Sequence, residues 1–109
     1  MSRMVHLGLD VGGTASRWVA CDGTGAVLAR GEAPGATGHL FNPAEKQRLA
    51  RSLGEIAEAL RAAGLRAASL TAGITGFGAA ARDEGRALAG EVLGLGGGDC
   101  TLMDDIVLG

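Results

Sequence analysis

The sequence predicts an α/β fold in which three strands are followed by a helix, a strand, a second helix and a last strand. Apolar residues alternate with polar ones in the first third of the chain, which is typical of strands with one buried face. The middle of the chain instead repeats apolar residues at helical spacing. With 109 residues, 47% of them hydrophobic, the chain can form one domain around one core. We therefore expect a mixed five-stranded sheet flanked by helices.

The first three strands are expected to form an antiparallel meander. Residues 4–10 place Val5, Leu7 and Leu9 on one face of a strand. A Gly-Gly pair separates this strand from the next, at 16–21, and a second glycine-containing turn leads into a third strand at 26–32. Short connections of this kind join neighbouring antiparallel strands.

The helix after the third strand has a well-marked start. Asn42 is expected to cap it, Pro43 to take its first position, and Glu45 to reach back to the cap. Gly64 is expected to end it. Its solvated face carries Arg48 and other charged residues, and its apolar stripe consists of Leu49, Leu53, Ile56 and Leu60.

The last third of the chain is predicted to hold strands at 68–75 and 100–103, with a helix at 79–93 between them. Gly85 and Gly90 lie inside this helix, and each costs about 1 kcal/mol relative to alanine. The predicted helix is therefore weaker than the first one.

The most informative motif is Asp10-Val11-Gly12-Gly13-Thr14, between the first two strands. Two glycines at the bend would permit φ > 0 and would leave no side chain between a phosphate and the amide N–H groups. Thr14 adds a hydroxyl donor, and Asp10 puts a carboxylate where a phosphate-bound Mg²⁺ could meet it. A Gly-Gly pair is also an ordinary hairpin signal. The motif alone therefore indicates either a phosphate loop or a simple turn.

Composition and charge argue against several classes of function. The formal net charge is −2 and the ten basic residues are scattered, so we expect no nucleic-acid partner. No apolar run reaches the ~18 residues of a membrane span, and the N-terminus lacks a signal core. We therefore expect no membrane association and a cytoplasmic location. Cys21 and Cys100 lie outside any ligand spacing, which predicts packed thiols and no zinc site.

The segment 9–17, the order of the predicted elements and the closing Asp105 resemble the N-terminal lobe of the sugar kinase, heat-shock chaperone and actin superfamily. Within it, the chain is most similar to the BadF/BadG/BcrA/BcrD ATPase family, which includes N-acetylglucosamine and glucosamine kinases. The resemblance covers nearly all of the 109 residues. It implies that residues 1–109 form a ribonuclease H-like, actin-like ATPase lobe that binds ATP and Mg²⁺ and phosphorylates an amino sugar.

The resemblance gives the first loop a role in holding ATP. Asp10 matches the carboxylate that works with Mg²⁺ in such kinases. The residues that the resemblance places at or near the phosphates are Gly12, Gly13, Thr14, Ser16 and Arg17.

Asp105 matches the base that takes a proton from the sugar hydroxyl as this hydroxyl attacks the γ-phosphate. The family usually has asparagine before it, where this chain has Asp104, so either carboxylate is a candidate. Adjacent residues of a regular strand point to opposite faces, so only one of the two can face the same cleft. The alternative is an acidic pair that ends a strand or caps a following helix.

The loop at 35–41 falls where the family's sugar-contacting loop lies. Thr37 and His39 would offer hydrogen bonds to sugar hydroxyls or to an acetamido group, and Gly38 matches the family's usual asparagine by spacing. Gly76 belongs to a small-residue turn beside the implied active site. The alternatives are a solvated loop histidine and glycines selected by packing alone.

The superfamily needs a second lobe with another phosphate loop, and these residues contain no candidate for it. We therefore expect the chain to be half of an ATP cleft, inactive alone. Two other functions stay open. One is an ATPase activator of an acyl-CoA reductase or dehydratase, whose relatives hold an iron–sulfur cluster between subunits. The other is a non-catalytic lobe that assembles with a partner, including a second copy as a homodimer.

Overall fold

The computed structural model describes residues 3–95 and 99–104. The predicted order of strands and helices is confirmed, with a short 3₁₀ helix added before the second α-helix. The elements are β1 (Arg3–Val11), β2 (Ala15–Cys21), β3 (Val27–Pro34), α1 (Pro43–Ala62), β4 (Leu65–Ile74), η1 (Ala79–Ala81), α2 (Arg82–Leu93) and β5 (Cys100–Asp104).

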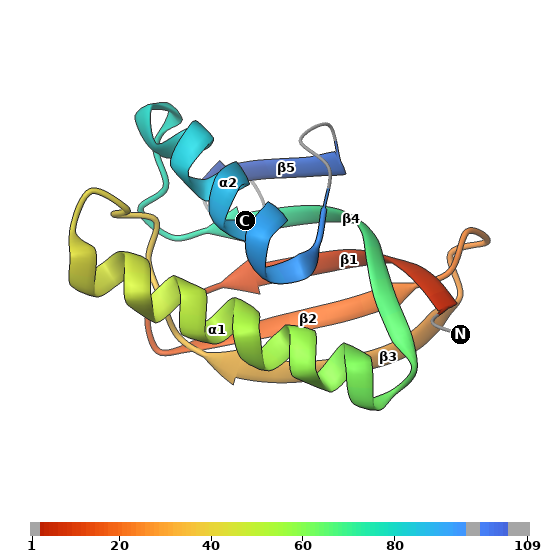
Figure 1. Cartoon of the computed structure of the whole chain (residues 1–109). Coiled ribbons are helices and arrows are strands. Elements are labelled where there is room, and N and C mark those ends of the chain that lie inside the picture. The colour runs from red at the N-terminus through yellow and green to blue at the C-terminus, as the bar shows by residue number, and fades with distance from the viewer. Residues whose placement is uncertain (1–2, 96–98, 105–109) are drawn as a thin grey trace.

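The strands form one five-stranded mixed sheet in the order β3-β2-β1-β4-β5 (Figure 1). The first three strands are antiparallel neighbours, as expected for a meander. β4 pairs parallel with β1, and β5 pairs parallel with β4. This strand order, with the first strand in the centre, gives the chain a ribonuclease H-like α/β fold.

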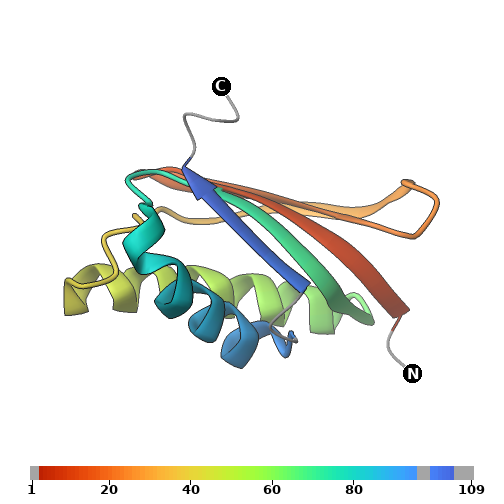
Figure 2. The same ribbon diagram turned by 90° about the horizontal axis from the view of Figure 1, so that it is seen from above.

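Both α-helices cover the same face of the sheet (Figure 2). The connections β3–α1–β4 and β4–α2–β5 each join parallel strands and move across the sheet in the same direction. Right-handed crossovers place both helices on one side when the direction is the same. The core lies between the two layers, and β1 contributes every second residue to it: Val5, Leu7, Leu9 and Val11.

Helix α1 has the predicted Asn42 cap at its start and the predicted Gly64 after its end. The Asn42 side chain accepts hydrogen bonds from the backbone N–H of Ala44 at 3.0 Å and of Glu45 at 3.4 Å. Gly64 follows the helix with φ +74°, the left-handed conformation that glycine adopts without strain. The predicted apolar stripe is buried: Leu49, Leu53, Ile56 and Leu60.

Gly85 has a packing role that the sequence could not reveal. An ideal Cβ at this position of α2 would lie 2.6 Å from Cδ1 of Leu102 on β5. Glycine therefore allows α2 to approach the sheet closely, which offsets its low helix propensity. The contact involves Leu102 on β5, a later element of the chain. Helix propensity alone therefore shows the destabilising effect of Gly85 and not its packing role.

Candidate functional site

The candidate site lies at the sheet edge where β1, β4 and β5 end, on the left in Figure 1. Parallel strands bring their carboxyl ends to one edge, and backbone hydrogen bonds join the loops there. The N–H of Ala36 donates to the carbonyl of Gly12 at 3.0 Å, and the N–H of Thr75 donates to that of Val11 at 3.0 Å. The N–H of Gly38 donates to the carbonyl of Thr75 at 2.8 Å. The first loop and both predicted sugar-binding segments therefore meet at this edge.

The turn at Gly12 and Gly13 differs from the expected one. Neither glycine has a left-handed φ, so the expectation of φ > 0 at this bend is wrong. Gly12 is required by a close approach instead, because its ideal Cβ would lie 2.9 Å from the carbonyl oxygen of Ala15, to which its own N–H donates. Gly13 is exposed, and nothing lies within 4 Å of the position of its ideal Cβ. Beside Gly13 and the exposed Thr14, the backbone is therefore open to a ligand.

Asp10 and Arg17 lie on the sheet face opposite the helices. They are partners across β1 and β2, and Arg17 is in turn the partner of Glu32 on β3. All three are exposed, since β1 turns Leu9 and Val11, the neighbours of Asp10, toward the core. Asp10 and Arg17 also line a cavity of about 820 Å³ on this face.

The exposed carboxylate of Asp10 fits a magnesium ion held mainly by phosphates. Mg²⁺ is usually bound through one or two carboxylates together with phosphate oxygens and water. Asp10 stands one residue before the end of β1, next to the open loop at Gly13. Among the described residues, no three His, Cys, Asp or Glu side chains group as a metal site by themselves.

The Ser16 side chain faces the core between the sheet and the helices. It is fully buried, and its hydroxyl donates to the carbonyl of Pro34 at 3.0 Å. Its partner across the sheet is Val11, which faces the helices. The hydroxyl therefore links β2 to the end of β3, and this role replaces the phosphate contact expected for the Ser16 side chain.

Two of the residues predicted to contact sugar, His39 and Gly76, lie against each other. Gly76 has φ +72°, and an ideal Cβ there would lie 2.7 Å from Nε2 of His39. The exposed His39 ring therefore lies in the space that the missing side chain of Gly76 leaves open. Gly38 is buried, and its ideal Cβ would lie 2.4 Å from Cα of Phe77, so packing explains this glycine.

The Thr37 hydroxyl has a partner within the protein. It donates to Oε2 of Glu45 at 2.8 Å and receives a longer hydrogen bond, 3.4 Å, from the His39 backbone N–H. The sequence position of Glu45 predicts that its side chain reaches back to the helix cap, and this prediction is wrong. The carboxylate instead accepts hydrogen bonds from Thr37 and Arg48. The same hydroxyl oxygen keeps acceptor capacity toward a ligand.

Of the two acidic candidates, Asp104 is the one that lies among the described residues, at the end of β5. Asp104 pairs with Ile74, which pairs with the buried Val11, so Asp104 lies in the row of residues that face the helices. It is half-buried and takes part in an interaction within the protein. Asp105, the predicted base, lies outside the described residues.

Arg48 is a site residue that the sequence analysis missed. Helical periodicity places it on the solvated face of α1, but its guanidinium donates to the Gly13 carbonyl at 2.9 Å and to the Gly35 carbonyl at 3.2 Å. It also donates to Glu45 at 3.1 Å. The one signal in the sequence is the Glu-Arg pair three residues apart at the start of the helix.

Acidification is expected to weaken the contact between Thr37, Glu45 and Arg48. The Thr37 hydroxyl, followed by Arg48, lowers the pKa of Glu45 below the ordinary value of a glutamate. Such a group stabilises the folded state above its unfolded-state pKa, and the stabilisation is lost as pH falls through the folded-state pKa. Glu45→Gln should therefore lose less stability than the wild type between about pH 5 and pH 3, measured by urea unfolding.

Asp22 provides the comparison for this experiment. The Thr24 hydroxyl and backbone N–H lower its pKa in the turn between β2 and β3. Asp22→Asn should reduce the acid sensitivity independently of Glu45→Gln, because the two sites share no partner. Equal acid sensitivity in the wild type and in Glu45→Gln would contradict the assignment of Glu45.

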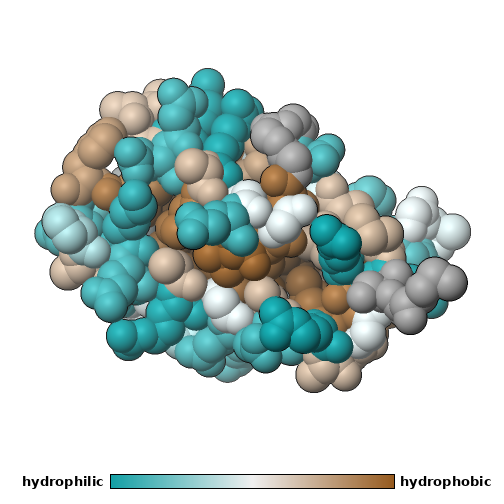
Figure 3. Space-filling model, viewed as in Figure 1, coloured by the Kyte–Doolittle hydropathy of each residue, from teal (hydrophilic) through white to brown (hydrophobic). Residues whose placement is uncertain are grey.

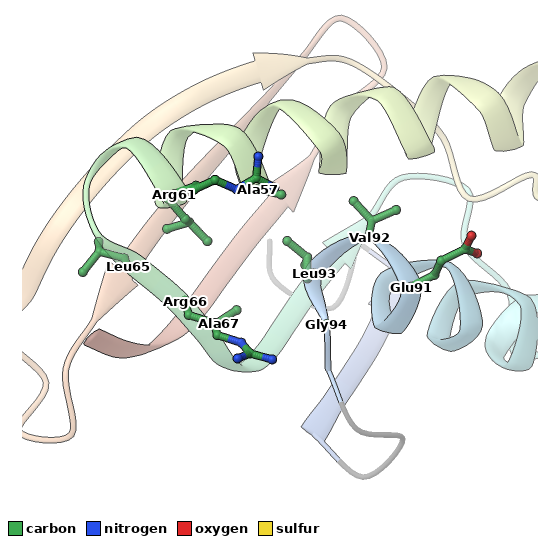
Figure 4. A pocket seen from close by; sticks show the side chains of 10 residues that line it. Ala57, Arg61, Leu65, Arg66, Ala67, Glu91, Val92, Leu93 and Gly94 are labelled. Atoms are coloured by element: carbon green, nitrogen blue, oxygen red, sulfur yellow. The ribbon is translucent and has the colours of Figure 1, made fainter. Parts of the chain in front are cut away.

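A second cavity, of about 290 Å³, lies at the other end of the sheet. It is formed where α1 and α2 end and β4 begins, and Figure 4 shows Arg61, Arg66 and Glu91 around it. Figure 3 shows hydrophobic residues gathered between the two helices on this side of the molecule, surrounded by hydrophilic ones. This cavity is separate from the candidate site.

Cys21 on β2 and Cys100 on β5 are free thiols, and burial raises the pKa of the Cys100 thiol. Of the helices in the described part of the chain, none has the length and apolar character needed to cross a membrane.

The sequence matches no protein-family model and no curated protein. Among solved structures, the chain is similar to ribonuclease H1 from the halophilic archaeon Halobacterium salinarum NRC-1, with a TM-score of 0.47 and 21% sequence identity. The similarity covers 92% of this chain and 83% of that one.

Proposed function

We propose that this chain is one lobe of an ATP-dependent kinase that phosphorylates an amino sugar, N-acetylglucosamine or glucosamine. Gly13 and Thr14 bind the nucleotide phosphates through backbone N–H groups. Gly12, whose own N–H donates to the Ala15 carbonyl, closes the turn beside them. Arg17 lies on the neighbouring strand with its charge exposed. A lobe of this kind needs a second lobe to complete the nucleotide site. The proposed enzyme uses cytoplasmic ATP.

The observation that carries the proposal is the open space beside Gly13. Glycine loses more conformational entropy on folding than any other residue, so a glycine usually has a structural reason. Gly13 has neither a left-handed φ nor a neighbour within 4 Å of its ideal Cβ. Phosphate binding would explain a glycine at this position, because a side chain here would block the access of a phosphate to the backbone N–H groups of the loop.

In this proposal each of the chain's candidate residues has its own part in phosphoryl transfer. Asp10 would hold Mg²⁺, which neutralises charge on the phosphates when bound. The loop at Thr37 and His39 orients the sugar, and Asp105 accepts the proton of the attacking hydroxyl. Backbone hydrogen bonds join the first loop, the loop at 35–39 and the turn at 75–76 to one another.

A phosphorylation screen tests the proposal. The full-length protein is incubated with Mg–ATP and N-acetylglucosamine, glucosamine or glucose, and ADP release is measured for each. We expect release that depends on one of the two amino sugars and exceeds release with glucose. ATP hydrolysis that no sugar accelerates would contradict the kinase and would favour an ATPase activator. Iron and sulfide analysis of anaerobically purified protein then tests that alternative.

A further inference from the structure

Arg48 connects three segments that are distant in sequence. One guanidinium nitrogen donates to the Gly13 carbonyl at 2.9 Å and to the Gly35 carbonyl at 3.2 Å. The other donates to the two carboxylate oxygens of Glu45, at 3.1 and 3.3 Å. The planar guanidinium presents its donors in a fixed geometry, which suits such simultaneous contacts. A side chain of α1 therefore holds both the first loop and the start of the loop after β3.

Glu45 extends this connection to the predicted sugar-binding segment. Its carboxylate accepts from the Thr37 hydroxyl at 2.8 Å as well as from Arg48. Hydrogen bonds to an ionised group are stronger than those between neutral groups. The contacts form a continuous chain from Thr37 through Glu45 and Arg48 to Gly13.

The orientation of the Gly13–Thr14 peptide depends on this chain of contacts. The described backbone contains no cis peptide, and in a trans peptide the carbonyl and the following N–H point in opposite directions. Because Arg48 binds the Gly13 carbonyl, the Thr14 N–H points away from Arg48. No atom lies within 4 Å of the Gly13 ideal Cβ, so this glycine has no packing on that side. Its carbonyl is held by the Arg48 hydrogen bond, next to the backbone of Gly35.

We propose that Arg48 is a positioning residue that couples the sugar loop to the phosphate loop. It turns the Thr14 N–H toward the nucleotide phosphates. Through Glu45 it links this orientation to the hydrogen bond that the Thr37 hydroxyl donates to Glu45. A sugar that hydrogen-bonds Thr37 changes the contact between Thr37 and Glu45, and Arg48 transmits this change to Gly13. This inference rests on the proposed kinase function.

The test compares Arg48→Gln and Arg48→Lys with the control Arg51→Gln in the full-length protein. Arg51 is an exposed arginine on the same helix and controls for loss of charge. Mg–ATP affinity is measured without and with saturating amino sugar. We expect the wild type to bind ATP more tightly with sugar. Arg48→Gln should weaken ATP binding roughly tenfold and remove the sugar effect. Arg48→Lys should restore part of the affinity, and Arg51→Gln should match the wild type.

A second measurement separates this inference from the proposed function. The ¹⁵N–¹H signal of Thr14 is followed in ligand-free protein after Thr37→Val, in the wild-type and the Arg48→Gln backgrounds. Coupling predicts a shift in the first background and none in the second. Equal shifts in both, or an unchanged sugar effect on ATP affinity in folded Arg48→Gln, would overturn the coupling. Absence of any Mg–ATP binding by the wild type would overturn the proposed function itself.

Discussion

Asp105→Asn is expected to reduce sugar phosphorylation by about 10²–10⁴-fold, the usual contribution of a general base. Asparagine keeps the shape of the side chain but cannot accept the proton of the attacking hydroxyl. Mg–ATP binding should change little, because the predicted phosphate contacts come from the first loop, at Gly13 and Thr14. The measurement is a steady-state assay of kcat together with a separate determination of ATP affinity.

Asp104→Asn is the matched control for this experiment. Asp104 lies in the row of residues that faces the helices and already interacts within the protein. Its substitution should affect stability more than kcat. Full activity of Asp105→Asn, combined with a large loss of kcat in Asp104→Asn, would reassign the base to Asp104.

Gly35→Ala is expected to lower the free energy of unfolding by about 1–3 kcal/mol, the usual cost of overpacking. An ideal Cβ at Gly35 would lie 2.5 Å from the carbonyl oxygen of Gly13 and 2.5 Å from the carbonyl carbon of Thr14. Both atoms belong to backbone, which cannot rotate away as a side chain can. The methyl group would therefore push the first loop out of place and disturb the Arg48 contacts with Gly13 and Gly35.

Gly13→Ala tests the other side of the same loop. Nothing lies within 4 Å of its ideal Cβ and its φ is not left-handed, so alanine should keep the stability or raise it by up to about 1 kcal/mol. ATP affinity should nevertheless fall, because the methyl group occupies the space proposed for phosphate. Chemical unfolding and ATP titration of both variants check the pair. A stability loss in Gly13→Ala equal to that of Gly35→Ala would contradict the description of the loop.

Local sequence patterns were sufficient to predict the architecture. Alternation identified β1, where Val5, Leu7 and Leu9 are buried, and the stripe from Leu49 to Leu60 identified α1. These signals are local, because a buried face repeats with the period of its own element. The position of both helices on one face follows from the strand order and the handedness of the crossovers. Hydrophobic periodicity gives no information about either of these.

The candidate site was less predictable because its contacts are non-local. Arg48 has the helical position of a solvated residue, and its partners Gly13 and Gly35 lie on loops that only the folded sheet brings near. Ser16 has the sequence position of a phosphate ligand but faces the core. One of the two reasons given for the Gly-Gly pair was wrong, because neither glycine has a left-handed φ. The close approach of Gly12 to the Ala15 carbonyl oxygen depends on the folded hairpin and has no signal in the sequence.

The most direct test of the central claim is a Mg–ATP titration of the protein labelled with ¹⁵N-glycine and ¹⁵N-threonine. Binding of phosphates by the first loop predicts saturable shifts of the Gly12, Gly13 and Thr14 amide signals, with no comparable change at Gly64, which lies at the end of α1. Inorganic phosphate should shift the same signals at higher concentration. Saturable ATP binding that leaves all three loop signals unchanged would contradict the account.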